Sequence, residues 1–560
     1  MIIRIVLAIL VGLSMKLVSP PIGLYQIHWF NLIPAFWAMR AGENKTNGWI
    51  MYLMGVSLIA SNYYWVSESV IAFSNLPTVI AWGIVLLYAL AYAIPFWFLG
   101  AAVHWIRGRA GIGWVWLIPG LQVCLEQIWP ALFPYYHGAL FYRAPITWQF
   151  ASIIGVTGVT YLVFLSNCAA VEFFYRKRDG LALFPKRHIL SCALMAMLYL
   201  FHIIYGISRY DTVEKELEKA DTLKVAILQQ NVTMTHRLSR SPWIAVRDWT
   251  KQTLRATRDK PDLVIWPEGA LGGPINPDDE RPAAPLGGKS LKEFFAELST
   301  RYNFALLIGG GTVNFHDELD DDGFPTYTAY NSCYLFNQQG EITGRYDKMV
   351  PLPFGEYIPF ADIFPILRKL IKGPGNFQAG NSVTYFQAEN DKFSYTFSTP
   401  ICYEAILNSQ MRKMANADLF INITNDAWFG DTAAPHQHAM LATVQSMEWG
   451  RPMFRLAYTG VSMVVEPHGQ IRYETKPFEE VVEVVPVRMG QTETLYRRGG
   501  WVFPWLWVFL WSGLGVKAFR DYRGSQKKRD AESLSKEDKG NLPPTEQPSN
   551  DNDGTQEDLS

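Results

Sequence analysis

Residues 393–404 read FSYTFSTPICYE, a largely apolar run that ends in Cys402, Tyr403 and Glu404. Its Phe, Tyr, Thr and Ile residues are typical of a buried β-strand. A helical pattern follows over residues 403–414, so this segment predicts a strand that leads directly into a helix. A junction of that kind is typical of an α/β domain, in which strands and helices alternate along the chain.

The same alternation continues on both sides of this segment, between residue 222 and about residue 487. Helical patterns are expected near 242–257, 289–302 and 436–450, and two Gly-containing hairpins near 332–347 and 461–475. The other strand-like runs are LKVAILQQN (223–231), PDLVIWPE (261–268), FALLIGGGTV (304–313) and ADLFINITND (417–426). The sequence therefore predicts one α/β domain with largely buried sheets.

Apolar stretches of membrane-crossing length fill the first 210 residues, at ~20 residues for each crossing. The N-terminal run has no small-residue cleavage site and leads into a second apolar stretch, so we interpret it as a retained anchor. Seven spans are expected near 3–18, 22–38, 48–68, 78–101, 113–133, 147–174 and 188–208, and an eighth near 499–519. The fold class predicted is thus a multi-span helical bundle joined to an α/β domain.

Basic residues are concentrated in the loops after the second, fourth and sixth expected spans. The loops after the third and fifth carry only Arg143 between them. The basic loops contain Arg40, Lys45, Arg107, Arg109, Arg176, Lys177, Arg178, Lys186 and Arg187. Because basic loops stay in the cytoplasm, both termini are expected there and the α/β domain on the opposite side.

These observations divide the chain into four parts. We predict a seven-span transmembrane domain over 1–210, an extracytoplasmic domain over 211–498, a final transmembrane helix over 499–520 and a tail over 521–560. The tail is polar and almost free of aromatic residues, so we expect it to be a disordered cytoplasmic segment.

Composition excludes several classes of function. A net charge of −1 gives no reason to expect nucleic acid as a partner. Five cysteines without a CxxC pair do not form a disulfide framework. Three of them (Cys124, Cys168 and Cys192) lie in apolar runs and are interpreted as buried thiols, which leaves Cys333 and Cys402.

Three polar residues lie where strands end, a favoured place for chemistry in α/β folds. Glu268 ends one predicted strand, Cys402 ends another and Lys348 follows a hairpin. A helix N-terminus lowers a thiol pKa, a carboxylate can take the thiol proton and a lysine can stabilise an oxyanion. Each residue also has a structural interpretation, as a helix cap, a buried small side chain and a solvated hairpin charge respectively.

Longer motifs around these residues resemble a known superfamily. WPEGALGGP (266–274), YDKMVPLPFGEYIPF (346–360), ICYE (401–404) and NDAWFG (425–430) are similar, in this order, to nitrilase-superfamily motifs. FGEYIPF, CYE and the HQHAM that follows NDAWFG resemble its membrane-embedded branch, the apolipoprotein N-acyltransferases. The resemblance covers nearly the whole chain apart from the tail.

This resemblance implies a four-layer αββα sandwich and a Glu-Lys-Cys triad, with Glu268 as general base, Lys348 as oxyanion cation and Cys402 as nucleophile. It also implies that Glu356 supports the lysine, and that Tyr403 and Glu404 lie in the active-site wall. No metal or organic cofactor is implied.

The implied activity is N-acylation of a lipoprotein. A phospholipid would donate the acyl chain to Cys402, and the diacylglyceryl-modified N-terminal cysteine of an apolipoprotein would accept it. The location implied is the bacterial inner membrane, with the catalytic domain on the periplasmic side.

Two segments depart from the family pattern. QQNVTMTHRLSRSP (229–242) does not align with the usual Gln-Gly-Asn segment. RLAYTGVS (455–462) carries Tyr458 where the family more often has an Asn-Asn-Gly or Asn-Thr-Gly run. Both departures concern the substrate pocket rather than the triad.

Several alternatives stay open from the sequence. Cys333 could pair with Cys402 in an oxidising compartment, and His436 with His438 could suggest a metal. The chain could instead be a membrane-tethered amidase or nitrilase acting on small amides, or a transporter or scaffold that only binds.

The connection between Lys348 and residue 375 is unusually apolar. It could be domain core, or a lid that enters the bilayer. In the lid interpretation, which we favour, Phe354, Phe360, Phe364 and Leu367 face lipid, as do Ile366 and Leu370, with Arg368, Lys369 and Lys372 at headgroup phosphates.

Overall fold

The structure is a computed structural model of the 560-residue chain, and it divides into two units, Met1–Trp505 and Leu506–Ser560. The residues that it describes are 1–40, 44–74, 76–110, 113–183, 189–232, 241–272, 276–319, 325–361, 363–366 and 376–540.

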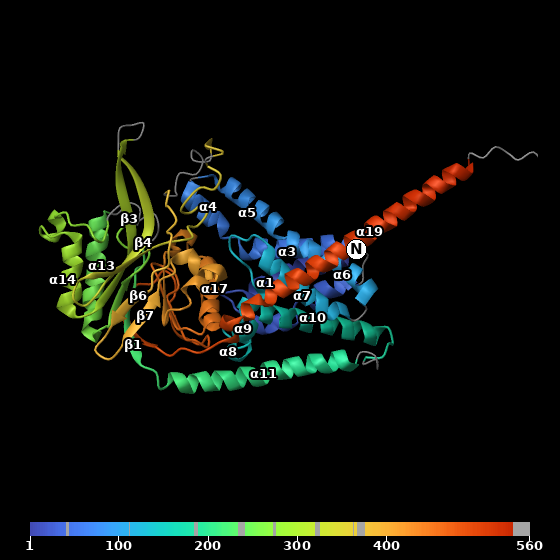
Figure 1. Cartoon of the computed structure of the whole chain (residues 1–560), viewed down its shortest axis with the longest axis horizontal. Coiled ribbons are helices and arrows are strands. Elements are labelled where there is room, and N and C mark those ends of the chain that lie inside the picture. Colours follow the sequence, from blue (N-terminus) through green and yellow to red (C-terminus); the bar gives the residue numbers. More distant parts are fainter. Residues whose placement is uncertain are drawn as a thin grey trace, which may run out of the picture. The chain divides into compact units, whose positions relative to one another are not determined.

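The first unit contains the predicted α/β domain, which is built on two six-stranded sheets (Figure 1). The first sheet has the order β12 (Val481–Arg488), β1 (Thr222–Gln229), β2 (Leu263–Trp266), β3 (Ala305–Leu319), β4 (Pro325–Phe336) and β5 (Ile342–Asp347). The second has the order β11 (Ile471–Glu474), β10 (Met463–Val465), β9 (Met453–Ala457), β8 (Leu419–Thr424), β7 (Ser394–Ser398) and β6 (Phe386–Glu389). In each sheet the middle strands are parallel, namely β1–β2–β3 and β7–β8–β9.

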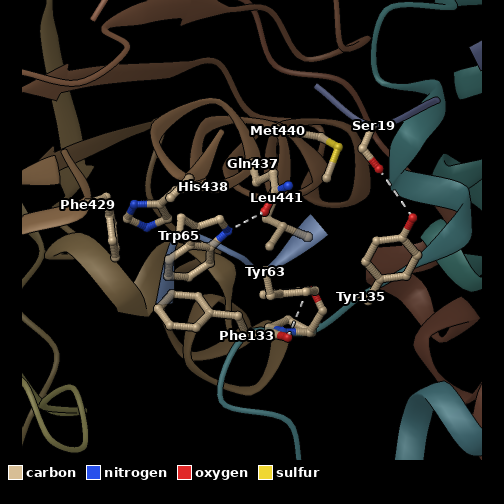
Figure 2. Close-up of a pocket in the computed structure, with 12 residues that line it drawn as sticks. Ser19, Tyr63, Trp65, Phe133, Tyr135, Phe429, Gln437, His438, Met440 and Leu441 are labelled. Carbon is tan, nitrogen blue, oxygen red and sulfur yellow. Dashed lines mark hydrogen bonds between the residues drawn. The ribbon is translucent and has the colours of Figure 1, made fainter. Parts of the chain in front are cut away.

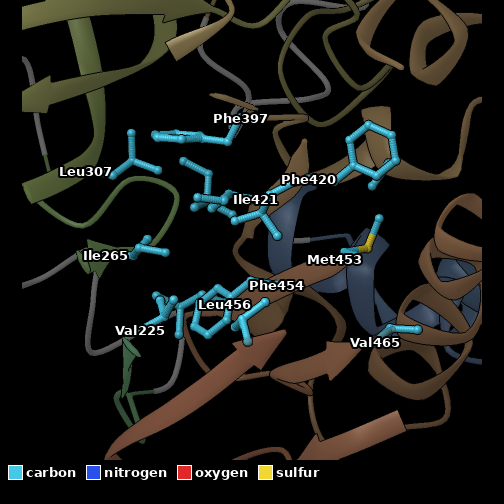
Figure 3. Close-up of a cluster of buried hydrophobic side chains, with 14 of the residues drawn as sticks. Val225, Ile265, Leu307, Phe397, Phe420, Ile421, Met453, Phe454, Leu456 and Val465 are labelled. Atoms are coloured by element: carbon cyan, nitrogen blue, oxygen red, sulfur yellow. The ribbon is translucent and has the colours of Figure 1, made fainter. Parts of the chain in front are cut away.

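The two sheets face one another across a buried apolar core. In Figure 3, Val225, Ile265 and Leu307 of the first sheet point toward Phe397 and Ile421 of the second. Strand side chains alternate between faces, so neighbouring residues of the same strands point away from this core. Close packing of two apolar faces is the main contribution that burial makes to the stability of such a sandwich.

Helices cover both outer faces of the pair of sheets. On the first sheet, Trp249 of α13 (Pro242–Ala256) and Phe295 of α14 (Leu291–Tyr302) pack in a second core. On the second sheet lie α16 (Asn408–Met414) and α17 (Ala434–Trp449), whose Met411 and Ala442 pack with the buried side chains of that sheet. The expected four-layer αββα sandwich is confirmed.

In its described residues the N-terminal part consists of helices joined by loops. Its longer helices are α1 (Ile2–Val18), α3 (Asn44–Asn62), α5 (Thr78–Tyr92), α6 (Ile94–Ala110), α7 (Trp114–Ile128), α10 (Val156–Arg178) and α11 (Ile189–Leu217). The shorter ones are η1 (Tyr25–Trp29), α2 (Ile33–Arg40), α4 (Val66–Ser74), η3 (His137–Phe141), α8 (Pro145–Trp148) and α9 (Ala151–Ile154). Close packing is visible where Gly12 of α1 meets α3, because a Cβ there would lie 2.3 Å from the Met54 carbonyl oxygen.

Among the described residues, four helical stretches are long and apolar enough to cross a membrane: Thr78–Val103, Val156–Arg178, Ile189–Leu217 and Gly500–Gln526. The seven-span count for the N-terminal part stays a prediction. The stretch expected at 22–38 is the turn η1 followed by the eight-residue α2, which spans only about 12 Å at ~1.5 Å for each residue.

The second unit consists, in its described part, of the continuation of α19 (Phe503–Gly540). This helix runs well past the end expected for the last span, so residues 521–540 are helical rather than irregular. Their sequence contains four Lys and two Arg residues, which are good helix formers. The rest of the expected tail, 541–560, lies outside the described residues.

Candidate active site

The three residues predicted to form a triad come together between the sheets. Lys348 follows β5, and its Nζ lies 3.4 Å from Oε1 of Glu268, which stands two residues after β2. Cys402 follows β7, and its thiol lies close enough to both charges for each to influence its pKa. All three are buried, with exposed fractions of 1% for Lys348 and 8% each for Glu268 and Cys402.

Glu268 is held by partners on both of its oxygens. Oε1 accepts a hydrogen bond from Nδ2 of Asn331 at 2.7 Å, and Oε2 accepts one from the backbone N–H of Asn425 at 2.8 Å. Gly309 of β3 passes directly behind this residue, because a Cβ there would lie 2.3 Å from the Pro267 carbonyl oxygen. The carboxylate is therefore fixed in position beside the lysine.

A second carboxylate, Glu356, contacts Lys348 more closely than Glu268 does. Its Oε2 lies 2.7 Å from Lys348 Nζ and accepts a hydrogen bond from the Leu352 N–H at 2.6 Å. Burial lowers the lysine pKa, but Glu356 and Glu268 outweigh it, and the pKa of Lys348 is raised. Lys348 is therefore a permanent cation. Glu356 lies beside it, as the resemblance to the nitrilase superfamily implies for a residue that supports the lysine.

Asn331 is a site residue that the sequence analysis missed. Its Nδ2 donates to Glu268 and also to Oε1 of Glu356, at 2.6 Å, so one amide spans both carboxylates. Asn is depleted from β-strands, and an Asn directly before the predicted 332–347 hairpin was the available signal. Its backbone carbonyl also accepts from the Lys348 N–H at 2.8 Å, which ties β4 to the lysine.

The nucleophile candidate has a strained backbone. Cys402 has φ of +52°, a left-handed conformation that costs a non-glycine residue about 1–2 kcal/mol. The helix expected over 403–414 is instead the 3₁₀ turn η7 (Cys402–Ile406) followed by the short α16. Strain of this kind persists only where the surrounding structure enforces it. The left-handed backbone changes the direction of the chain at Cys402, after the end of β7.

The thiol pKa of Cys402 moves in the direction opposite to the one expected. Burial raises it, the Glu268 charge raises it further, and Lys348 opposes both. The expected lowering by a helix N-terminus is wrong, because η7 is a single 3₁₀ turn and the thiol is almost entirely removed from water. The resting group is therefore a thiol, which needs a base before it can attack.

Glu404 lies behind the site and connects its parts. It is fully buried and accepts hydrogen bonds from the Tyr346 hydroxyl at 2.8 Å and from the N–H groups of Met349, Val350 and Ile401 at 2.8, 3.0 and 2.8 Å. Burial raises its pKa to about 7. One carboxylate thus connects the segment that follows Lys348 to the segment that precedes Cys402.

A buried ionic network lies under the nucleophile. Asp426 contacts Arg455 (Nη2 to Oδ2, 2.8 Å) and His438 (Nδ1 to Oδ1, 2.8 Å), and both Asp426 and Arg455 are fully buried. Although burial raises the carboxyl pKa, Arg455 and His438 outweigh it, and the pKa of Asp426 is lowered. His438, considered above as a metal ligand, is therefore engaged with Asp426. All five cysteines are free, so the Cys333–Cys402 disulfide is wrong.

We expect Asp426→Asn to destabilise the domain by about 3–5 kcal/mol, because it leaves Arg455 as a buried charge without a partner. A carboxyl pKa that is lowered by folding stabilises the native state above the unfolded pKa of about 3.9 and loses that contribution as pH falls. The loss in Asp426→Asn should therefore be large at pH 7 and shrink in strongly acidic solution. Thermal unfolding checks this, with Asp391→Asn in the exposed β6–β7 turn as control; equal stability of both variants at pH 7 would contradict it.

One cluster outside the site has metal-ligand residue types. Glu214, Glu466 and His468 bring ligand atoms within 4.8 Å of one another. Arg472 and Arg488, however, form ion pairs with both carboxylates. Two arginines already balance two glutamates, so the cluster is an ion-pair network that fastens the end of α11 to the sandwich.

Comparisons with known proteins agree with this geometry. The carbon-nitrogen hydrolase family matches residues 224–497, and the apolipoprotein N-acyltransferase N-terminal domain matches residues 11–169. A protein of Geobacter metallireducens named apolipoprotein N-acyltransferase is 29% identical over 526 residues, which cover 92% of this chain and 95% of the relative. The chain belongs to the apolipoprotein N-acyltransferase family.

Other similarities have the same pattern. An apolipoprotein N-acyltransferase of Agrobacterium fabrum is 28% identical over 498 residues, covering 84% of this chain and 87% of that one. A solved carbon-nitrogen hydrolase of Helicobacter pylori G27 is 15% identical, with a TM-score of 0.35, and covers 50% of this chain and 94% of its own. The family assignment therefore rests on the family models and the relatives alone.

Helices of the family's N-terminal domain form one wall beside the site. Figure 2 shows a small aromatic pocket where Trp65 donates to Oε1 of Gln437 at 3.0 Å. Gln437 in turn donates to the Asn62 carbonyl at 3.1 Å. Phe133 contacts this pocket and also the Tyr403 ring, at a centroid distance of 5.9 Å. Tyr403, next to the nucleophile, is therefore in contact with the N-terminal domain, and burial raises its pKa to about 12.

The apolar segment after Lys348 lies at the surface. Phe354, Phe360 and Phe364 are exposed by 47%, 67% and 57%, and Ile363 and Ile366 are also exposed. Phe354 and Phe360 have φ of +63° and +62°, so local geometry directs these rings outward at an energetic cost. The core interpretation is wrong for these side chains; Leu367, Arg368, Lys369, Leu370 and Lys372 lie outside the described residues.

Proposed function

We propose that this chain transfers an acyl chain from a phospholipid to the amine of a diacylglyceryl-modified N-terminal cysteine on an apolipoprotein, through a thioester on Cys402. The observation that carries the proposal is a buried thiol with a fixed carboxylate and a permanent lysine cation beside it. Membership of the family and the names of the relatives support the acceptor and the reaction class.

In the first half-reaction Glu268 takes the proton of the Cys402 thiol, and Sγ attacks the ester carbonyl carbon of the phospholipid. The carbonyl oxygen becomes an anion beside Lys348, which stabilises it. The carbon–oxygen bond of the ester then breaks, Glu268 returns the proton to the departing oxygen, and a lysophospholipid leaves. The acyl group is now a thioester on Sγ.

In the second half-reaction the α-amine of the acceptor attacks the thioester carbonyl carbon. Glu268 takes a proton from the attacking nitrogen, and Lys348 again stabilises the oxyanion. The carbon–sulfur bond breaks, the cysteine recovers its proton, and an amide remains on the acceptor. Water must be kept from the thioester, which agrees with the low exposure of all three residues.

The same proposal places the catalytic domain on the periplasmic side of the inner membrane, with both termini in the cytoplasm. Two observations support this placement. Basic residues are concentrated in alternate loops between the expected N-terminal spans, and the stretch Gly500–Gln526 is long and apolar enough to return the chain across the membrane.

Mass spectrometry of the purified enzyme mixed with phospholipid tests the proposal. We expect an acyl adduct on Cys402 that neutral hydroxylamine removes, and that an N-terminal diacylglyceryl-cysteine peptide discharges as an N-acylated product. Cys333→Ser, which alters another buried thiol of the same domain, should leave the adduct unchanged, while Cys402→Ala should abolish it. Hydrolysis of a small amide without any adduct from phospholipid would favour the amidase alternative instead.

The exposed segment supports a further part of the proposal, that it forms a lid in contact with lipid. Phe360→Asp should lower kcat/KM for phospholipid in vesicles about 10- to 100-fold, because a ring that enters an apolar phase contributes about 1.5–3 kcal/mol. Thermal stability should hardly change, since the ring already lies in solvent.

The matched control is Phe315→Asp, since Phe315 is exposed to a similar extent (63%) but lies on the distant part of β3. Unfolding of Phe360→Asp, or an equal loss of activity in both variants, would show that the segment does not contact lipid.

A further inference from the structure

A cavity of about 240 Å³ lies beside the nucleophile turn and has no part in the mechanism above. One side of it is formed by residues 406–409, which begin four residues after Cys402. The other sides come from α3, α5, α6, α7 and the loop 129–136 of the N-terminal domain. The cavity therefore joins the catalytic domain to the helices that the chain places in the membrane.

One wall of this cavity carries a carboxylate without a cation. Glu126 of α7 accepts hydrogen bonds from Nε2 of Gln122 at 3.3 Å, from the His137 N–H at 3.2 Å and from Oγ1 of Thr160 at 3.0 Å. No basic side chain in the described part of the chain forms an ion pair with it. A carboxylate in a membrane-embedded helix is costly, and such groups are normally paired or functional.

A second acceptor lines the same wall. Oε1 of Gln122 is buried and has no hydrogen-bond partner among the described residues, while its Nε2 is engaged with Glu126. That engagement fixes the orientation of the amide, because the opposite orientation would set an oxygen against the carboxylate. Oε1 of Gln122 thus lacks a donor, and a buried unpaired acceptor is unfavourable. Glu126 beside it has its hydrogen bonds but no cation. A positively charged N–H donor would supply both missing interactions.

The remaining walls are aromatic. The cavity is lined by the rings of Tyr92, Phe96, Trp129, Tyr135 and Tyr136. Aromatic faces attract cations, above all organic ammonium groups that have left water. A metal ion would need more oxygen or nitrogen ligands than one carboxylate and one amide. An acyl chain would leave the Gln122 oxygen unpaired and Glu126 without a counter-ion.

We infer that this cavity is a subsite for an organic ammonium group, with Glu126 as counter-ion and Gln122 as hydrogen-bond acceptor. The inference rests on the proposed function for its two possible sources. The ammonium belongs either to the headgroup of a zwitterionic phospholipid donor or to the α-amine of the acceptor before it loses its proton.

Glu126→Gln tests the subsite, since it keeps the shape and removes the charge. With the full-length enzyme in nanodiscs, one half-reaction should slow about 10- to 100-fold, the usual range for a hydrogen bond to a charged group. If the headgroup is the source, Cys402 acylation slows with phosphatidylethanolamine but not with phosphatidylglycerol of the same chains. If the acceptor is the source, both donors acylate normally and discharge by the N-terminal cysteine peptide slows. Glu68→Gln, an exposed carboxylate on α4, is the matched control and should change neither step.

A binding measurement keeps the test decisive if the variant folds poorly or the proposed function fails. Ethanolammonium chloride should raise the thermal midpoint of the wild-type enzyme above that in sodium chloride of equal strength. The increase should be absent in Gln122→Met and in Glu126→Gln. No stabilisation of the wild type, together with normal rates of both half-reactions in Glu126→Gln, would overturn the inference. Failure of the wild type to form any adduct would count only against the proposed function.

Discussion

Glu268→Gln is expected to slow acylation of Cys402 by about 10³-fold, within the range of 10²–10⁴ that general bases contribute. The thiol pKa is raised by burial, so almost no thiolate exists at neutral pH without a base. The Gln side chain keeps the volume of Glu and an oxygen for the Asn331 amide. The loss should therefore come from the missing base rather than from misfolding, and lysophospholipid release with adduct mass measures it.

The pH dependence distinguishes a missing base from damage to the site. Without Glu268, attack depends on thiolate formed by hydroxide, so the residual rate of Glu268→Gln should rise about tenfold for each pH unit. The control Glu389→Gln, on the exposed edge of β6, should follow the wild-type profile. A normal rate of adduct formation in Glu268→Gln would show that another group takes the thiol proton.

Local patterns predicted the α/β domain and the candidate residues at its strand ends, and the motif resemblance implied the four layers and the triad. The strand-to-helix alternation from 222 to 487 predicts layered sheets, and helices expected at 242–257 and 436–450 are found at Pro242–Ala256 and Ala434–Trp449. Glu268, Lys348 and Cys402 were identified because each follows a strand, and parallel strand ends meet at one edge. Position alone left a structural interpretation open for each of the three, and the resemblance to the nitrilase superfamily implied their roles.

Other features of the site depend on contacts between distant parts of the chain. Asn331 bridges Glu268 and Glu356, and these three lie on separate segments that only the folded sheet brings together. The pairing of Asp426 with Arg455 and the left-handed backbone of Cys402 have the same origin. No local period encodes such contacts, so the sequence analysis missed the two polar networks and reversed the direction of the thiol pKa.

The helix bounds of the N-terminal part show a different limit. Hydropathy averages over a window and does not detect where backbone hydrogen bonding is interrupted. The stretch expected at 78–101 is two helices that meet at Ile94–Pro95, since proline lacks the N–H that a continuous helix needs. The stretch expected at 22–38 is interrupted between η1 and α2. Apolar content predicted the region correctly and the individual helices less well.

Lys348→Met is expected to slow both half-reactions by at least about 10³-fold, since loss of one oxyanion donor costs about 10²–10³ and a full charge contributes more. The lysine is buried, permanently charged and in contact with both carboxylates. Its removal has a second effect, because Glu268 and Glu356 then repel each other without a cation between them. This repulsion should lower the thermal stability of the variant.

A double variant separates these two effects. Lys348→Met with Glu356→Gln leaves a single carboxylate, so thermal stability should recover toward that of the wild type. Acylation should stay slow, because no cation faces the oxyanion. The control Lys392→Met, at an exposed turn, should change neither stability nor rate. Recovery of adduct formation in the double variant would show that Lys348 only balances the charges of the two glutamates. Continued inactivity with restored stability would show that its ammonium group stabilises the transition state.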